Sequence, residues 1–186
     1  MVVGLGNPGI EFVNTRHNAG AEAVAELAVR HGGRLKSEKG LFAQACDVRI
    51  DGRRVLLAVP QTFMNESGLA VASLVRRGGD GASLIVVHDE LDLPRGRIKV
   101  KMGGGTAGNN GLKSIDSHLH TNEYVRVRIG IGKPPGRQPG ADYVLKRPGA
   151  AERATLVAAI DEAADAVEAI VSDGVDAAMN QVNAGT

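Results

Sequence analysis

Residues 2–20 read VVGLGNPGIEFVNTRHNAG, and this stretch decides the fold that we predict. The apolar run Val2–Leu5 is typical of a buried strand, and the turn residues 6–9 end it. A helical pattern begins only after the polar segment that contains His17. The loop behind the first strand of an open α/β sheet is where such folds bind their ligands. We therefore expect Asn7 and His17 to lie in a functional site.

The glycines of this stretch match a nucleotide-binding fingerprint, but their context does not. Gly4, Gly6 and Gly9 satisfy Gly-x-Gly-x-x-Gly. In the fingerprint the last glycine lies in a helix that opens within the motif, whereas here Pro8 precedes Gly9 and no helix-start signal follows. The pattern therefore disfavours a dinucleotide site.

Length and composition indicate one soluble globular domain. The chain has 186 residues, of which 43% are hydrophobic and 23% charged, so we predict a single domain over residues 1–186. Cys46 is the only cysteine, which excludes an intrachain disulfide and suits a reducing, cytoplasmic location. No apolar run approaches about 20 residues and no signal-peptide pattern is present, so we expect no membrane partner.

The net charge of +1 conceals a segregation of charge along the chain. Residues 95–147 carry 11 basic and 3 acidic side chains, whereas residues 148–186 carry 1 basic and 7 acidic ones. A basic block of this kind suggests a polyanionic partner, with nucleic acid first. A solvated basic face, balanced by the acidic residues that follow it, is the alternative.

Strand and helix patterns alternate along the rest of the chain. Phe42–Ile50 and Val55–Val59 predict an antiparallel hairpin, and the apolar run Leu84–Val87 predicts a central strand covered on both faces. We predict an α/β fold: a single-domain three-layer sandwich with a mixed, largely parallel twisted sheet flanked by helices. The buried face expected for the helix between these two regions consists of Leu69, Ala72 and Val75.

The basic side chains of the block fall on two further predicted strands. Apolar and other residues alternate in 97–102 and 125–131, which indicates strands with one apolar face each. The opposite faces consist of Lys99, Lys101, Arg126 and Arg128. These side chains either face water or contact phosphates.

A histidine and a carboxylate are expected to meet at one end of the sheet. Asp89 closely follows the apolar strand, so its carboxylate should lie near the loop that carries His17. A carboxylate beside a histidine selects the imidazole tautomer and stabilises the imidazolium. No Gly-x-Ser-x-Gly elbow exists and Cys46 lies within a strand, so a covalent nucleophile is poorly supported. The remaining chemistry is a histidine that activates water, with asparagine amides that bind a carbonyl and its oxyanion.

Each of these residues also has a purely structural explanation. His17 could cap a helix, the asparagines could be turn residues, and Phe12 and Phe63 could belong to the core. The run His88-Asp89-Glu90 lacks the spacing that divalent metals prefer, so we expect no metal site.

Six segments together resemble one family. They are GLGNPG (4–9), TRHNAG (15–20), TFMNESG (62–68), HDELDLP (88–94), GGGTAGNNGLK (103–113) and RVRIGIGKP (126–134). In this order they resemble the bacterial peptidyl-tRNA hydrolases. The resemblance implies a monomeric esterase that needs no metal, no other cofactor and no obligate protein partner. It also implies hydrolysis of the ester that joins a peptide to the 3′ ribose of tRNA in N-blocked peptidyl-tRNA.

The resemblance assigns roles residue by residue. His17 resembles the catalytic base, Asp89 the acid that orients and stabilises it, and Asn7 the residue that distinguishes N-blocked peptidyl-tRNA from free aminoacyl-tRNA. The expected substrate contacts are Phe12, Phe63, Met64, Asn65, Asn109 and Asn110. Lys101 and Arg128 resemble residues that receive tRNA phosphates, and we expect Lys99 and Arg126 to join them.

Two positions depart from the family pattern. Phe12 stands where the family often has tyrosine, and Asn109 stands where it commonly has histidine. A hydroxyl is lost at the first position and a proton-linked role at the second. Two other functions stay open: an RNA-binding protein without hydrolysis and a general esterase. A binding module needs the basic strands but no catalytic histidine, whereas a general esterase needs no basic block.

Overall fold

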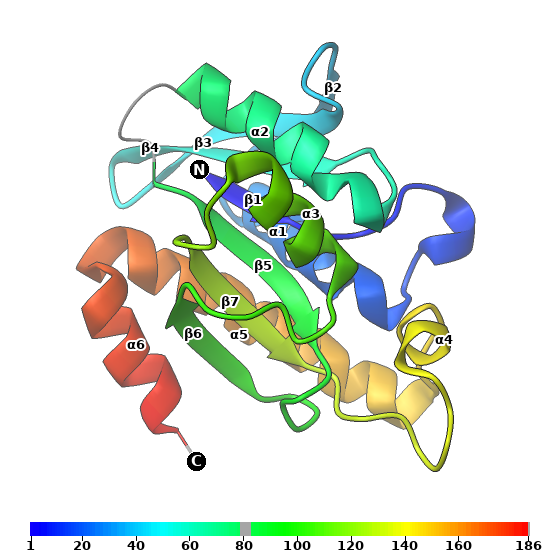
Figure 1. Cartoon of the computed structure of the whole chain (residues 1–186). Coiled ribbons are helices and arrows are strands. Elements are labelled where there is room, and N and C mark those ends of the chain that lie inside the picture. Colours follow the sequence, from blue (N-terminus) through cyan, green and yellow to red (C-terminus); the bar gives the residue numbers. More distant parts are fainter. Residues whose placement is uncertain (79–82, 186) are drawn as a thin grey trace.

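A seven-stranded sheet forms the middle layer of the computed structural model, which describes residues 1–78 and 83–185 (Figure 1). The strands are β1 (Val2–Gly4), β2 (Lys36–Glu38), β3 (Ala43–Ile50), β4 (Arg53–Pro60), β5 (Ile85–Glu90), β6 (Ile98–Met102) and β7 (Val125–Gly130). The helices are α1 (Ala19–Arg30), α2 (Ser67–Gly78), α3 (Asn110–Leu119), α4 (Gly140–Val144), α5 (Ala150–Asp173) and α6 (Val175–Ala184). Short 3-10 helices are η1 (Ile10–Phe12), η2 (Arg16–Asn18) and η3 (Met64–Glu66).

The strand order is β2-β3-β4-β1-β5-β7-β6. The central strands β4, β1, β5 and β7 run parallel, and the pairs β2–β3, β3–β4 and β6–β7 are antiparallel. Every residue of β5 is buried, as expected for a strand covered on both faces. The predicted hairpin and the predicted mixed sheet flanked by helices are therefore confirmed.

Helices cover both faces of the sheet, which gives the three layers (Figure 1). The first core lies under α1 and α5 and contains Val24, Leu27 and Val87. The second core lies under α2 and α3 and contains Val86 and Leu112. Because successive side chains of a strand point to opposite faces, β5 contributes to both cores and ties the layers together.

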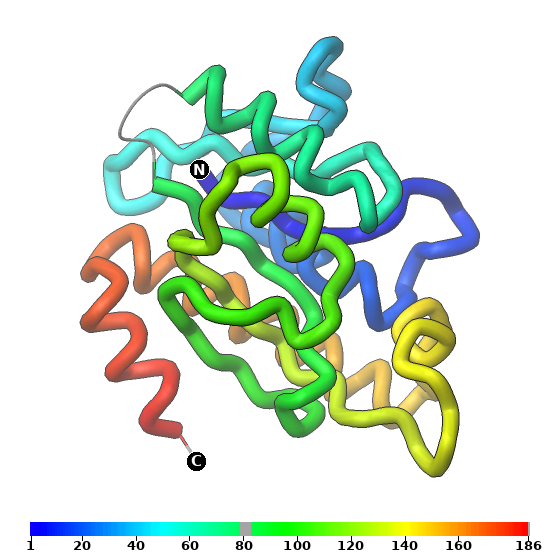
Figure 2. The backbone as a smooth tube through the Cα atoms, viewed as in Figure 1, coloured from blue at the N-terminus to red at the C-terminus, as the bar shows by residue number. Residues whose placement is uncertain are grey.

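The C-terminal helix α6 runs beside the edge strand β6 (Figure 2). The Asn183 side chain accepts a hydrogen bond from the Val100 N–H and donates one to the Val100 carbonyl, each at 2.9 Å. This amide satisfies the outward backbone groups of Val100, which would otherwise be open to another strand. No helix in the described ranges is long and apolar enough to cross a bilayer.

The buried face of α2 differs from the prediction. Leu69 is 37% exposed, whereas Val71 and Leu74 are buried. The reason is the close contact of α2 with α3 at Gly68, where an added Cβ would lie 2.1 Å from the Ser114 carbonyl oxygen. This contact rotates the helix so that Gly68, rather than Leu69, faces the protein. The short elements β2, α4 and the 3-10 helices were also not predicted, because they are too short to show a period.

Close packing explains two of the three glycines that resemble a nucleotide fingerprint, Gly4 and Gly6. A Cβ added at Gly4 would lie 2.2 Å from the Gly20 carbonyl oxygen, and one added at Gly20 would lie 2.1 Å from the Val87 carbonyl oxygen. A Cβ at Gly6 would lie 3.0 Å from Cγ of Asn18. The glycines let the first turn of α1 approach β1 and β5 at backbone distance.

Gly20→Ala should lower the free energy of unfolding by about 3 kcal/mol, because the new methyl group meets a strand carbonyl that cannot rotate away. Denaturant unfolding followed by circular dichroism measures the change. Gly105→Ala is the control, since an added Cβ there meets no atom within 4 Å. An unchanged stability of the Gly20 variant would contradict the close approach of α1 to β5.

Candidate active site

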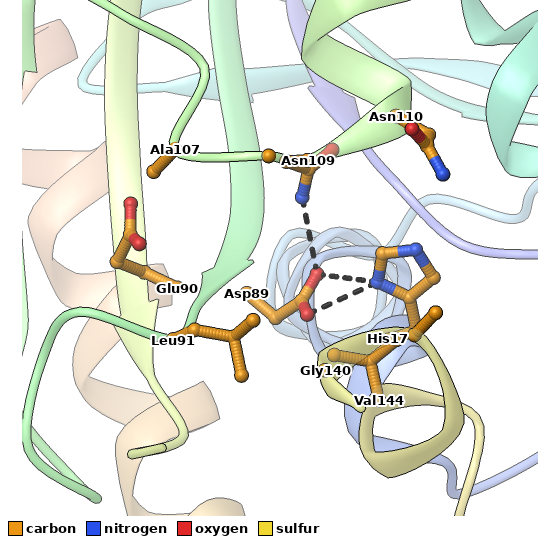
Figure 3. Close-up of a pocket in the computed structure, with 11 residues that line it drawn as sticks. His17, Asp89, Glu90, Leu91, Ala107, Asn109, Asn110, Gly140 and Val144 are labelled. Atoms are coloured by element: carbon orange, nitrogen blue, oxygen red, sulfur yellow. Dashed lines mark hydrogen bonds and ion pairs between the residues drawn. The ribbon is translucent and has the colours of Figure 1, made fainter. Parts of the chain in front are cut away.

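The 3-10 helix η2 and the end of β5 bring His17 and Asp89 into contact (Figure 3). Nδ1 of His17 lies 2.9 Å from Oδ1 and 3.0 Å from Oδ2 of Asp89. Both residues are buried, with 7% of His17 and 3% of Asp89 exposed. The approach of Gly20 to Val87 brings the loop before α1 to the end of β5, where Asp89 lies.

The contact with Asp89 determines the tautomer and the basicity of His17. Nδ1 faces a carboxylate and therefore carries the proton, so Nε2 holds the lone pair of the neutral imidazole. Burial by itself lowers the pKa of His17, but the charge of Asp89 and its hydrogen bond raise it by more. The pKa of His17 therefore lies above its ordinary value of 6.5. Nε2 can therefore accept a proton, and the imidazolium that forms is stabilised by the Asp89 carboxylate at Nδ1.

Arg16 fixes η2 against the C-terminal part of the chain. Its Nε and Nη2 donate to the two carboxylate oxygens of Glu152 at 2.6 and 2.9 Å. Nη1 donates to the carbonyls of Tyr143 and Lys146, and the guanidinium lies 4.0 Å from the centroid of the Tyr143 ring. The hydrogen bond from Arg16 holds the pKa of Glu152 below its usual range. Arg16 thus keeps α4 and the start of α5 beside His17.

No sequence pattern assigns Arg16 a role, although the residue stands in the segment TRHNAG (15–20). A signal was present in the acidic first turn of α5, where Glu152 could serve as a partner for a buried cation. Pairing over such a sequence separation is not visible from local patterns.

A buried pair of asparagines shapes the loop after β1. The Asn18 side chain accepts from the Asn7 N–H at 2.9 Å and donates to the Asn7 carbonyl at 3.0 Å. Oδ1 of Asn7 accepts the Met64 N–H at 2.7 Å, and this bond fixes the orientation of the amide. The side-chain NH2 of Asn7 is the group left to donate to a ligand. Asn18 lies in a polar segment that the sequence marks as a candidate, but its pairing with Asn7 is visible only in the structure.

Helix α3 begins at Asn109 and Asn110, close to the contact between His17 and Asp89. Oδ1 of Asn109 accepts the N–H groups of Gly111 and Leu112 at 2.9 and 3.1 Å, which makes Asn109 the N-cap. Its Nδ2 lies 3.5 Å from Oδ1 of Asp89 (Figure 3). Capping α3 and contacting Asp89 both require an amide group, and neither requires a side chain that changes its protonation state. Asn110, the first residue of α3, is exposed.

A cavity of about 250 Å³ opens beside His17 and Asp89. Its walls come from the end of β5, from the loop between β6 and α3, and from α4. The wall residues besides the pair are Glu90, Leu91, Ala107, Gly108, Asn109, Asn110, Gly140, Ala141 and Val144. The cavity gives a ligand access to the imidazole from a side where amide groups are available.

The remaining predicted substrate contacts lie around η3, outside the lining of this cavity. The rings of Phe12 and Phe63 meet edge to face, with centroids 6.3 Å apart, and Phe63 is 55% exposed. Asn65 is exposed on η3. Asn7 belongs to this group through its bond to Met64. The structure therefore divides the predicted residues between the cavity and an aromatic surface next to the loop after β1.

Met64 is predicted to contact the substrate, and the structure places its side chain mostly inside the protein. Met64 is 4% exposed and packs in the second core. Its Sδ would lie 2.6 Å from a Cβ added at Gly111, so it fills the space beneath the start of α3. Met64 acts on the site through its backbone N–H, which orients Asn7.

The four basic residues of β6 and β7 share one face of the sheet, as the alternation predicts, but they are not equally accessible. Lys99 pairs with Arg128 across the strands, and Lys101 pairs with Arg126. Lys101 is exposed, and Arg128 forms an ion pair with Glu90 at 3.1 Å. Arg126 is only 2% exposed, whereas the alternation predicts a side chain at the surface, so its predicted contact with phosphate is not carried into the proposal below. The loop between β6 and α3 covers it.

No group of three His, Cys, Asp or Glu side chains converges within residues 1–78 and 83–185. His88 precedes Asp89 but points to the opposite face of β5. Its Nδ1 lies 2.7 Å from the Asp89 carbonyl, and burial lowers the pKa of His88. His88 is therefore a neutral core residue.

A sheet with parallel central strands, and a histidine–carboxylate pair at the carboxyl end of β5, define an α/β enzyme equipped for acid–base chemistry. The family model described as peptidyl-tRNA hydrolase matches residues 1–186, and the chain belongs to this family of hydrolases. The resemblance noted in the sequence is thereby confirmed.

Relatives of known name agree with this assignment. The peptidyl-tRNA hydrolases of Nocardia farcinica and Rhodococcus erythropolis are each 50% identical over 184 residues. These alignments cover 98% of this chain and 95% or 97% of the relative. The crystal structure of peptidyl-tRNA hydrolase from Acinetobacter baumannii is 39% identical, with a TM-score of 0.91 over 98% of this chain and 93% of that one.

The His17 imidazole should titrate with a midpoint above pH 6.5 in the wild-type protein. In Asp89→Asn burial persists while the carboxylate charge is gone, so the midpoint should fall below 6.5. NMR of the imidazole C–H resonances against pH measures both values. Coincident titrations of the two proteins would contradict the control of His17 by Asp89.

Proposed function

We propose that the chain hydrolyses the ester bond between the peptide and the 3′ ribose of N-blocked peptidyl-tRNA, with His17 as the general base. Membership of the peptidyl-tRNA hydrolase family supports the substrate. The observation that carries the mechanism is the contact of 2.9 Å between the buried His17 imidazole and Asp89 beside a cavity. An imidazole held in this way is suited to take a proton from water near neutral pH.

In the proposed reaction, Nε2 of His17 accepts a proton from a water as the water oxygen attacks the ester carbonyl. The carbonyl oxygen becomes an oxyanion, and the imidazole becomes an imidazolium facing the Asp89 carboxylate. When the intermediate collapses, the bond to the 3′ oxygen of the ribose breaks and the imidazolium proton passes to that oxygen. The products are a free peptide acid and a tRNA with a free 3′ hydroxyl.

Amide donors would hold the peptide and the developing charge. The free NH2 of Asn7 is suited to a carbonyl of the N-blocked peptide, because its Oδ1 is already occupied by the Met64 N–H. Asn65 and Asn110 are exposed and are proposed to contact nearby carbonyl groups. The faces of Phe12 and Phe63 offer an apolar surface to peptide side chains. Asn109 is proposed to act on Asp89, to whose carboxylate its side-chain NH2 donates.

Lys99, Lys101 and Arg128 are proposed to receive the tRNA phosphates. They share one face of β6 and β7 within the basic block of residues 95–147. Lysine and arginine on such a face supply the sequence-independent part of nucleic-acid affinity. We further propose that the protein acts as a monomer in the cytoplasm, where its single cysteine stays reduced.

His17→Ala should lower the turnover of peptidyl-tRNA by about 10²-fold or more and leave tRNA binding largely unchanged, because it removes only the base. Asp89→Asn should lower turnover by less than His17→Ala does, since the imidazole is still present. Single-turnover release of peptide from an N-blocked aminoacyl-tRNA measures the rates. His31→Ala, at the other end of α1, is the control.

Two outcomes would contradict this mechanism: near-normal turnover of His17→Ala, or loss of wild-type turnover on addition of a chelator. An RNA-binding module without activity would bind the same substrate and release no peptide.

Lys101→Met should weaken tRNA binding and reduce the slope of log affinity against log salt by about one, because one phosphate contact is lost. Turnover of a minimal substrate without the tRNA body should hardly change. Lys36→Met, on the strand β2 at the opposite edge of the sheet, is the matched control. An equal loss on both substrates would place the action of Lys101 elsewhere.

A further inference from the structure

Arg126 lies inside the protein, although its neighbours on the basic face reach the surface. It is 2% exposed and is the largest fully buried side chain in the described part of the chain. Within that part, the only carboxylate closer than 4 Å is Asp116, at 3.8 Å, and Asp116 already accepts the Tyr124 hydroxyl. Burying a cation without a close carboxylate partner costs free energy. The position of Arg126 therefore requires an explanation beyond phosphate binding.

The guanidinium of Arg126 binds the backbone of the loop between β6 and α3. Nη1 donates to the Gly105 carbonyl at 2.6 Å, and Nη2 donates to the Gly104 carbonyl at 2.8 Å. The plane also lies over the ring of Tyr124, 4.8 Å from its centroid. A planar group with several donors is suited to hold two successive carbonyls at once.

This loop has almost no side chains with which to pack. Glycine occupies 103, 104, 105 and 108, and Gly103, Gly104 and Gly108 have left-handed φ values of 63°, 108° and 80°. Glycine loses more conformational freedom on folding than other residues, so such a segment is ordered only by bonds to its backbone. Arg126 supplies two of these bonds, and the Asn122 side chain supplies a third to the Gly104 carbonyl at 3.2 Å.

The same loop leads directly into the active site. Ala107, Gly108, Asn109 and Asn110 line the cavity. Asn109 caps α3 and reaches Asp89 at 3.5 Å. A shift of residues 104–105 would therefore move the amide that contacts the carboxylate of the catalytic pair.

The loop also touches the proposed phosphate-binding face. A Cβ added at Gly104 would lie 2.6 Å from Nζ of Lys101, so the ammonium group rests against this glycine. Figure 2 shows the loop passing from β6 across β7 toward α3. Gly104 is thus held by Arg126 through its carbonyl and covered by Lys101.

We propose that Arg126 is a positioning residue: it holds residues 103–110 in the conformation that places Asn109 against Asp89 and Asn110 at the cavity, and it links this loop to Lys101. The expected change in kcat rests on the proposed function, whereas hydrogen exchange of the loop tests the inference independently of it. Loss of the two carbonyl bonds lowers kcat and leaves the affinity for the tRNA body intact.

Arg126→Lys keeps the charge and removes the two-pronged contact, since an ammonium cannot span both carbonyls in the same plane. Amide hydrogen exchange of residues 105–110 should become about 10-fold faster or more, while exchange in β5 and β7 stays unchanged. On peptidyl-tRNA, kcat should fall by about 10-fold or more, because a misplacement of about 1 Å in the catalytic groups can cost up to about 10²-fold. The Kd for deacylated tRNA should change by less than about two-fold. Arg34→Lys, at an exposed position, is the matched control.

Asn122→Ala is a second variant whose exposed position leaves the core intact. It removes only the third bond to Gly104, so exchange of the same residues should quicken by less than in Arg126→Lys. The order of effects, Arg126→Lys above Asn122→Ala above wild type, in both loop exchange and kcat, supports the proposal.

Three results would overturn the proposal. A weaker Kd for deacylated tRNA with unchanged loop exchange would assign Arg126 to phosphate binding. Faster exchange throughout β5 and β7 would make it an ordinary core residue. Unchanged loop exchange and unchanged kcat would remove any role in positioning. If wild-type protein releases no peptide, the proposed function fails, and loop exchange still decides whether Arg126 orders the loop.

Discussion

The first turn of α1 lies against the backbone of β1 and β5, and the whole site depends on this approach. A side chain at Gly20 would collide with the Val87 carbonyl, and a side chain at Gly4 would collide with Gly20. His17 precedes this turn, and Asp89 follows Val87 on the same strand. A packing constraint between glycines therefore sets the distance between the imidazole and the carboxylate. Gly4, which belongs to a pattern that suggests a nucleotide site, thus takes part in the packing that brings His17 to Asp89.

Burial and pairing act in opposite directions on the pKa values of His17 and Arg16, the two neighbouring residues at this contact. Burial disfavours the protonated form of His17, and Asp89 restores it, with the net effect of a raised pKa. Arg16 shows the same balance with Glu152, and this second pair holds the wall of α4 in place. At His88 burial outweighs the charges of Asp89 and Glu90, and the pKa is lowered.

Much of the fold follows from short-range patterns in the sequence. Alternation identified β6 and β7, a continuous apolar run identified β5, and the rule that ligands bind at the carboxyl ends of strands led to the contact of His17 with Asp89. Alternation assigns a residue to a face of the sheet but does not say what covers that face. For this reason Arg126 was expected at the surface, whereas a loop from the neighbouring strand buries it.

Other features depend on contacts between distant segments. The side of α2 that is buried depends on how closely Gly68 meets α3, and the five-residue helix α4 has too few turns to show a period. The double role of Asn109, as cap and as partner of Asp89, needs both α3 and β5 in place. The burial of Met64 also depends on distant segments, because its sulfur packs beneath α3 only once the second core is assembled.

The claim that a neutral imidazole at position 17 takes the proton from water is tested most directly by chemical rescue. Free imidazole is added to His17→Ala. In the wild-type protein a cavity of about 250 Å³ adjoins the His17 side chain, so space for the added imidazole is available there. We predict that peptide release rises with imidazole concentration and follows the neutral form as pH is varied. Absence of rescue at every pH, in a variant that still binds tRNA, or rescue that follows imidazolium, would contradict a general-base role for His17.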